Sequence, residues 1–229
     1  MANPGNMSNQ TLKTVKAKVI NLTPEKIVTT SNSQTRNDLV EVIKRLAGEG
    51  GCPATSGNFS VLLSSNPLRM LISPSGVDKT LITADDLLEV SERAEVLCGT
   101  GRPSAETLLH TAIYQTSEAK CVLHVHSVWN TIISEKFLNA GAVEICGYEI
   151  LKGLPGVSTH EHQERIPVFE NSQDMSRLSQ LVLQELKRDH SVKAFLLAGH
   201  GVYTWGESPS KAYCHLQALE FLFEVLCRK

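Results

Sequence analysis

Apolar residues recur along the chain at two different spacings, and each spacing predicts a different element. Spacings of three and four residues, typical of one face of a helix, occur in the segments 39–47, 108–113, 175–186 and 212–226. Short apolar runs predict strands at 59–63, 70–73, 121–126 and 194–198. Helices and strands therefore intermix along the chain, which indicates an α/β fold in which a mixed sheet carries helices on both faces.

Local signals mark where several of these elements begin. Ser208 and Pro209 open the last helix, because proline suits the first helical turn. Ser104 is expected to cap the helix that contains 108–113. Asn66-Pro67 separates two predicted strands and indicates a hairpin.

The first 33 residues lack this patterning. They are rich in Asn, Ser, Thr and Lys, so we expect a flexible leader over 1–33 and a single catalytic domain over 34–229. No stretch approaches the roughly 20 apolar residues that a membrane helix needs. The N-terminus also lacks the apolar core of a signal peptide, which favours a cytoplasmic protein.

Composition narrows the function classes. The formal net charge is −2 and the basic residues are scattered, which gives no electrostatic case for binding nucleic acid or an acidic membrane. None of the six cysteines forms a CxxC pair, and several lie in apolar stretches. A reduced, cytoplasmic protein fits this pattern best.

Histidines provide the strongest chemical signal. His124 and His126 stand two residues apart in an apolar predicted strand, so their side chains project from the same face, about 7 Å apart at Cα. His200 follows a second apolar run between two glycines. Three imidazoles that leave one coordination position open are typical of a catalytic zinc site. The alternative is a pair of polar residues on a half-buried strand.

Three turn-rich segments accompany the histidines, at 54–58, 73–76 and 102–106. Backbone N–H groups at glycine turns and helix N-termini, with hydroxyl and amide side chains, bind phosphate well. Ordinary turn formation is the alternative for each segment alone. The candidate phosphate-binding residues are Ser56, Gly57, Asn58, Ser75, Gly76 and Ser104.

Two glutamates are candidates for acid–base catalysis. Glu106 falls in the first turn of a predicted helix, where it could instead complement the helix dipole. Glu149 lies among apolar residues, where partial burial would raise its pKa towards neutrality; the alternative is a surface acid. His160 and His162 form a second HxH pair, but their polar neighbours indicate a loop. Packing or solvation is the expected role of Lys79, Lys152, Tyr203, Trp205 and Glu207, with substrate or subunit contact as the alternative.

Taken in order, these segments resemble the class II aldolase/adducin family over about residues 36–228. The resemblance rests on 56–58, 73–76, 103–106, 124–126 and 200–206. Within the family, 148–153 and 203–207 are most similar to a dehydratase that acts on a phosphorylated ketose.

The resemblance implies a three-layer αβα fold with a central mixed, largely antiparallel sheet, and a tetramer with sites near its subunit interfaces. It implies one Zn²⁺ per subunit on His124, His126 and His200, and phosphate binding at the turns named above. In the family's aldolases the residue matching Glu106 is the acid/base, whereas in the dehydratase that role falls to the residue matching Glu149. We expect Glu149 to be the base and Glu106 to be secondary.

Two other functions remain open. A class II aldolase or 4-epimerase acting on another ketose phosphate would use overlapping chemistry. Ala105 stands where the sugar-phosphate aldolases often carry serine, which weakens that reading. A non-catalytic interaction module of the adducin type would be favoured by loss of the histidine triad, but all three histidines are present.

Overall fold

The computed structural model describes Met1 and residues 24–229, with side chains from residue 33 onward. The first helix, α1 (Pro24–Gly48), begins ten residues before the end of the predicted leader. The rest of that leader, residues 2–23, lies outside the described residues. None of the helices in the described part is long and apolar enough to cross a membrane.

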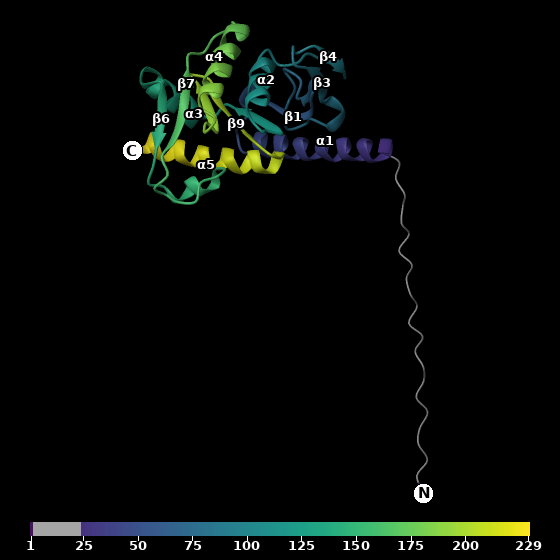
Figure 1. Ribbon diagram of the computed structural model, residues 1–229, viewed down its shortest axis with the longest axis horizontal. Helices are drawn as coiled ribbons and strands as arrows, with labels where there is room; N and C mark the ends of the chain where they lie inside the picture. Colours follow the sequence, from purple (N-terminus) through teal and green to yellow (C-terminus); the bar gives the residue numbers. More distant parts are fainter. Residues whose placement is uncertain (2–23) are drawn as a thin grey trace.

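A nine-stranded sheet forms the centre of the described chain (Figure 1). Its strands lie in the order β4-β3-β2-β1-β5-β9-β8-β7-β6, and only β7 and β8 are parallel neighbours. The predicted mixed, largely antiparallel sheet is therefore confirmed. The strand bounds are β1 Asn58–Ser65, β2 Leu68–Ile72, β3 Leu88–Ser91, β4 Val96–Cys98, β5 Cys121–Val125, β6 Ala142–Ile145, β7 Glu164–Phe169, β8 Ala194–Leu197 and β9 Gly201–Gly206.

Helices cover both faces of the sheet and give the three layers that the resemblance implied. The long helices α1 and α5 (Pro209–Arg228) run along one face, where α3 (Val128–Phe137) also packs against α5 (Figure 1). Helices α2 (Thr107–Thr116) and α4 (Met175–Arg188) pack against each other on the other face. Short 3₁₀ helices occupy Pro53–Thr55, Ala84–Asp86, Leu138–Ala140 and Glu149–Gly153.

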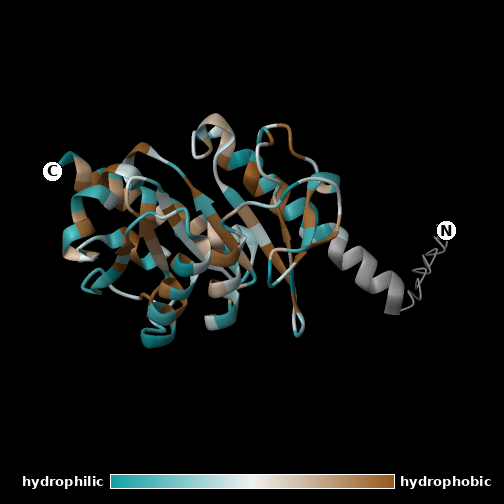
Figure 2. Cartoon of the chain, turned by 90° about the horizontal axis from the view of Figure 1, so that it is seen from above, coloured by the Kyte–Doolittle hydropathy of each residue, from teal (hydrophilic) through white to brown (hydrophobic). Residues whose placement is uncertain are grey.

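Side chains along the central strands alternate between the two faces of the sheet, so each face has its own hydrophobic core. Leu123 and Val125 of β5 belong to the core under α1 and α5, whereas Val122 belongs to the core under α2 and α4 together with Tyr203. Figure 2 shows the apolar residues concentrated in the strands and the polar ones on the outer loops. His124 has the same parity as Val122, so its side chain lies on the α2/α4 side of the sheet.

Most local predictions are confirmed. β1 and β2 form the predicted hairpin, and the Ser208 side chain accepts a hydrogen bond from the backbone of Lys211 at the start of α5. The predicted cap at Ser104 is wrong, because Glu106 is the N-cap of α2. Instead, Ser104 Oγ accepts a hydrogen bond from the backbone N–H of Glu106, which holds the turn before the helix.

Candidate metal and phosphate site

The three predicted histidines come together at one end of the central sheet. β5 pairs with β9 in antiparallel register, so the end of β5 meets the start of β9, with Val125 opposite Val202. His124 lies on β5, His126 just beyond it, and His200 immediately before β9. One ligand nitrogen from each ring lies within 4.8 Å of the other two. These three residues form a group that could hold a metal ion.

Hydrogen bonding and burial favour the neutral imidazole form that can bind a metal. His124 Nδ1 lies 3.0 Å from the carbonyl oxygen of Val202, which leaves Nε2 to face His126 Nε2 at 2.8 Å. Burial holds the pKa of His124 well below its usual range and lowers that of His126 to about 4. Neutral imidazole is the form that binds metal, so this donor set fits a divalent ion.

Gly201 permits the close approach of these rings. A Cβ at this position would collide first with the carbonyl oxygen of Val125 on β5, and it would also lie 2.8 Å from His124 Cε1 and 3.0 Å from His126 Cδ2. A side chain there would therefore disturb both the strand pairing and the imidazoles. Gly201, one of the two glycines that flank His200 in the sequence, is therefore required for the packing of the site.

Glu106 contacts two of the three histidines. Its carboxylate oxygens lie 3.2 Å from both His124 Nε2 and His200 Nε2, and Tyr203 donates a hydrogen bond to it at 2.6 Å. Burial alone would raise the pKa of Glu106, but the hydrogen bonds from His200 and Tyr203, together with the electrostatic interactions with the neighbouring imidazoles, outweigh burial and lower it. Glu106 is thus held as a carboxylate beside the proposed metal ligands.

A buried polar chain leads away from Glu106. Asn58 donates to Glu106 at 2.7 Å, and its carbonyl oxygen lies 2.5 Å from His110 Nε2. The other ring nitrogen of His110 lies 2.7 Å from Ser60 Oγ, which in turn contacts the Tyr114 hydroxyl at 2.8 Å. The sequence pattern did not predict this chain. Its members come from β1 and α2, about 50 residues apart, so spacing carried no signal.

The predicted phosphate turns lie beside the triad. Gly57 adopts φ +79°, and a Cβ there would lie 2.8 Å from the carbonyl oxygen of His124, so the first turn packs directly on the histidine strand. The second turn is tied to the third, because Ser75 N–H donates to the Arg102 carbonyl at 2.9 Å. Asn58 Nδ2 lies 3.2 Å from Ser104 Oγ. The structure therefore brings all three turns to the same end of the sheet.

Two buried polar atoms at this end have no hydrogen-bond partner among the described residues. They are Ser56 Oγ and His200 Nδ1. Buried polar groups almost always find partners. Partnerless atoms on a predicted phosphate turn and on a predicted metal ligand fit a site that a ligand completes.

Glu149 differs from its sequence-based description. Its side chain is 70% exposed, and its 3₁₀ helix packs against α5 on the other side of the sheet from Tyr203. The expected raised pKa is wrong: the hydrogen bond from Lys152 outweighs desolvation and lowers the pKa of Glu149. Within one chain, the structure does not bring Glu149 to the triad.

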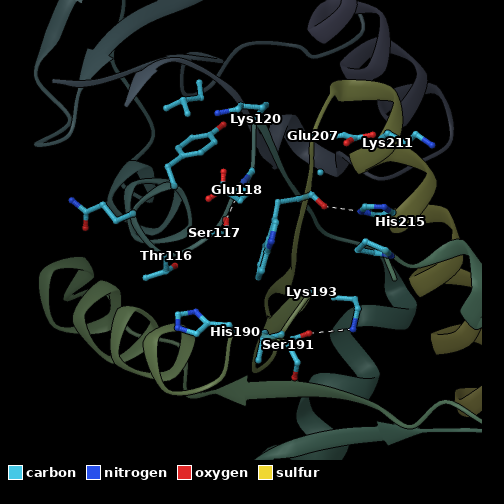
Figure 3. A pocket seen from close by; sticks show the side chains of 18 of the residues that line it. Thr116, Ser117, Glu118, Lys120, His190, Ser191, Lys193, Glu207, Lys211 and His215 are labelled. Carbon is cyan, nitrogen blue, oxygen red and sulfur yellow. Dashed lines mark hydrogen bonds between the residues drawn. The ribbon is translucent and has the colours of Figure 1, made fainter. Parts of the chain in front are cut away.

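A separate hollow of about 1040 Å³ lies at the opposite end of the same strands (Figure 3). It is lined by residues that precede β5 and β8 and that follow β9, including Lys120, Lys193 and Glu207. The Lys193 ammonium is neutralised by Glu164 at 2.8 Å. None of the candidate metal, phosphate or acid–base residues lines this hollow.

The family model described as Class II Aldolase and Adducin N-terminal domain matches residues 37–227. The chain belongs to this family. Among curated relatives, the methylthioribulose-1-phosphate dehydratase of Methylococcus capsulatus is 43% identical over 192 residues, which cover 83% of this chain and 92% of the relative. The protein of that name from Pseudomonas fluorescens is 40% identical over 195 residues, covering 85% and 92%.

Solved structures of the family share the fold. YgbL of Klebsiella pneumoniae, described as a putative aldolase/epimerase/decarboxylase, aligns with a TM-score of 0.71 at 25% identity, covering 86% of this chain and 90% of that one. An L-fuculose 1-phosphate aldolase aligns with a TM-score of 0.68 at 20% identity, covering 85% of each chain. The predicted class II aldolase-like architecture is thereby confirmed.

Proposed function

We propose that this class II aldolase-family protein is a methylthioribulose-1-phosphate dehydratase, a hydro-lyase of methionine salvage. The observation that carries the proposal is the junction of a histidine triad, a carboxylate and three glycine- or serine-containing turns at one end of the sheet. The relatives at 40–43% identity bear this activity in their names and match the chain over most of its length.

The reaction removes water from 5-methylthioribulose 1-phosphate. A base takes the proton from C3, the C4 hydroxyl departs with a proton as water, and the resulting enol becomes the 2,3-diketone, 5-methylthio-2,3-dioxopentyl phosphate. The chain must therefore hold the phosphate end, acidify the C3 hydrogen, and supply a group that first accepts and then donates a proton.

His124, His126 and His200 would hold the metal, proposed to be one Zn²⁺ per subunit. A divalent ion there would act as a Lewis acid on the carbonyl next to C3. The bond from the His124 ring to Val202 keeps the ligand nitrogen aimed at the ion. Glu106 lies against two of the three rings and supports their positions.

The turns would anchor the phosphate. Ser56, Ser75 and Ser104 supply hydroxyls, and Asn58 links the first and third turns through its bond to Ser104. The partnerless Ser56 hydroxyl supports this role, because a phosphate oxygen would satisfy it. Gly57 and Gly76, both at positive φ, shape the turns.

For the proton transfer we propose Glu149, contributed to the triad by a neighbouring copy of the chain. The group that accepts and then donates the proton must be free to reach the substrate. Glu106 is poorly suited, because its carboxylate is already held by His124, His200 and Tyr203. Glu149 is exposed and pairs with Lys152 and His160 at the surface, so a second subunit can receive it. This proposal requires a homo-oligomer, and we expect a tetramer. We also expect the protein to act in the cytoplasm.

The contact of Glu106 with the triad also favours a second candidate, an aldolase or 4-epimerase acting on another ketose phosphate. Assay of the zinc-loaded protein against methylthioribulose 1-phosphate, fuculose 1-phosphate and ribulose 5-phosphate separates the two. Release of water and a diketone from the first compound alone is expected. Cleavage of fuculose 1-phosphate into aldehyde and ketone fragments would establish the aldolase instead.

A further inference from the structure

Lys79 is a buried lysine that links two of the predicted phosphate turns. Its side chain is 2% exposed, although lysine is among the residues most rarely buried. Nζ donates to the Thr55 carbonyl at 3.3 Å, in the first turn. It also donates to the Pro74 carbonyl at 3.4 Å, in the second turn, and to the Val77 carbonyl at 3.1 Å, just after that turn. One ammonium group therefore joins two segments about twenty residues apart.

No carboxylate among the described residues forms an ion pair with this ammonium. The neighbouring Asp78 is exposed, and its carboxylate instead accepts two hydrogen bonds from Thr80. The nearby Cys52 does not serve either, because burial raises the pKa of its thiol to about 11 and keeps it neutral. The hydrogen bonds of this buried ammonium go to carbonyl oxygens, and the charge of Asp78 offsets its burial only in part, because burial still lowers the pKa of Lys79.

The surroundings of Lys79 are ready for an anion. Ser56, next to Thr55, carries the buried hydroxyl that has no partner. A Cβ placed on Gly76, in the second turn, would have no atom within 4 Å, so there is open space beside that turn. A buried positive charge without an ion-pair partner among the described residues, a hydroxyl without a hydrogen-bond partner and open space thus occur together.

We propose that Lys79 is the internal countercharge of the phosphate site and the positioning residue that keeps its two turns together. The ligand is a phosphate monoester dianion. It binds to the two turns that Lys79 holds together, and its negative charge there compensates the positive charge of the buried ammonium. The proposal rests on the phosphate site of the proposed function. It adds a residue that acts behind the binding groups and does not itself touch the substrate.

Two substitutions separate charge from hydrogen bonding. Lys79→Gln can still donate to the carbonyls but is neutral, whereas Lys79→Arg keeps the charge. Lys120→Gln, at an exposed lysine beside the distant hollow, is the matched control. The measurements are the Kd of inorganic phosphate by calorimetry, KM and kcat for methylthioribulose 1-phosphate, zinc content, and circular dichroism.

Lys79→Gln should raise the phosphate Kd and the KM roughly tenfold or more, because a unit charge near a dianion is lost from a poorly solvated position. Zinc content should be unchanged and kcat should change less than KM. Lys79→Arg and Lys120→Gln should bind phosphate nearly as the parent does. Equal phosphate affinity in folded Lys79→Gln and the parent would overturn the proposal, since hydrogen bonding alone would then explain the residue.

If Lys79→Gln does not fold, the Lys79→Arg variant tests the proposal. Phosphate binding retained in this variant supports the proposal. A folded, zinc-loaded Lys79→Arg protein that no longer binds phosphate overturns it. The outcome is independent of the substrate assignment. A parent protein that binds phosphate in a Lys79-dependent way but does not dehydrate methylthioribulose 1-phosphate would reject the proposed function alone. Dehydration without measurable phosphate binding would reject the role of Lys79 alone.

Discussion

His124 Nδ1 lies 3.0 Å from the backbone carbonyl oxygen of Val202, across the pairing of β5 with β9. The carbonyl accepts only from a protonated nitrogen, so Nδ1 carries the hydrogen and Nε2 keeps its lone pair. The same ring stacks on Tyr203, with centroids 3.9 Å apart. The ligand tautomer of His124 is thus set by the sheet itself, before any metal binds.

The first prediction concerns the metal. His124→Ala, His126→Ala or His200→Ala should each remove bound zinc and activity together, because two imidazoles hold zinc far more weakly than three. Zinc content by elemental analysis and dehydratase activity check this. His162→Ala is the matched control, since His162 belongs to an HxH pair but bonds Glu164 at 2.8 Å, away from the triad. Full zinc content in the triple triad variant would show that the ion binds elsewhere.

A second prediction separates the two glutamates. Glu149→Gln should lower kcat about 10²–10⁴-fold, the usual loss for a positioned acid/base, while zinc content is kept. Glu106→Gln should lower kcat less and weaken zinc binding, because it releases His124 and His200. Steady-state kinetics and metal analysis measure both.

The same prediction extends to mixed oligomers. Inactive His124→Ala and Glu149→Gln chains, refolded together, should regain part of the activity, because one interface would then combine an intact triad with an intact Glu149. No recovery, together with a larger kcat loss in Glu106→Gln, would assign the proton transfer to Glu106 within one chain.

Gly57 and Gly76 allow a paired test of the phosphate turns. Both have positive φ, +79° and +73°, so alanine at either position should cost roughly 1–2 kcal/mol of backbone strain. Only Gly57→Ala also forces a Cβ against the His124 carbonyl. It should therefore destabilise the fold more than Gly76→Ala in urea unfolding and should also weaken zinc binding. Equal losses in the two variants would contradict the packing of the first turn on the histidine strand.

Ser75 tests the second turn directly. Ser75→Asp should raise KM strongly or abolish turnover, because a fixed negative charge repels the substrate phosphate. The side chain is exposed in the substrate-free chain, so fold and zinc content should persist. Unchanged kinetics would remove Ser75 from the site.

His110 should make the metal-free protein sensitive to acid. Burial lowers its pKa from 6.5 to about 4, so between these values the unfolded chain binds a proton that the folded chain does not. Stability should then fall as pH drops from about 6.5 to 4, by up to about 3 kcal/mol from this residue. The free energy of unfolding of His110→Gln should depend less steeply on pH over that interval. The same slope in both proteins would contradict the prediction.

Periodic elements were predictable because their signals are local. The stripe in 212–226, the hairpin around Asn66-Pro67 and the histidine strand each follow from residues within one segment. The short β3 and β4 went unassigned, since their apolar positions are few. The helix α3 also went unassigned, although Val128, Ile132 and Ile133 have helical spacing. Residue type therefore determined which segments could be helix or strand, but not the order of strands in the sheet.

The chemistry divides in the same way. The sequence by itself determined that three histidines, two glutamates and three turns were available, because HxH spacing and glycine turns act through local backbone geometry. Only the tertiary structure decided that, within one chain, Glu106 and not Glu149 contacts the triad. It also decided that Asn58 and His110 extend from Glu106 and that Lys79 links two turns. These contacts join segments far apart in the chain, and their burial and pairing energies exist only once the sheet and helices have packed.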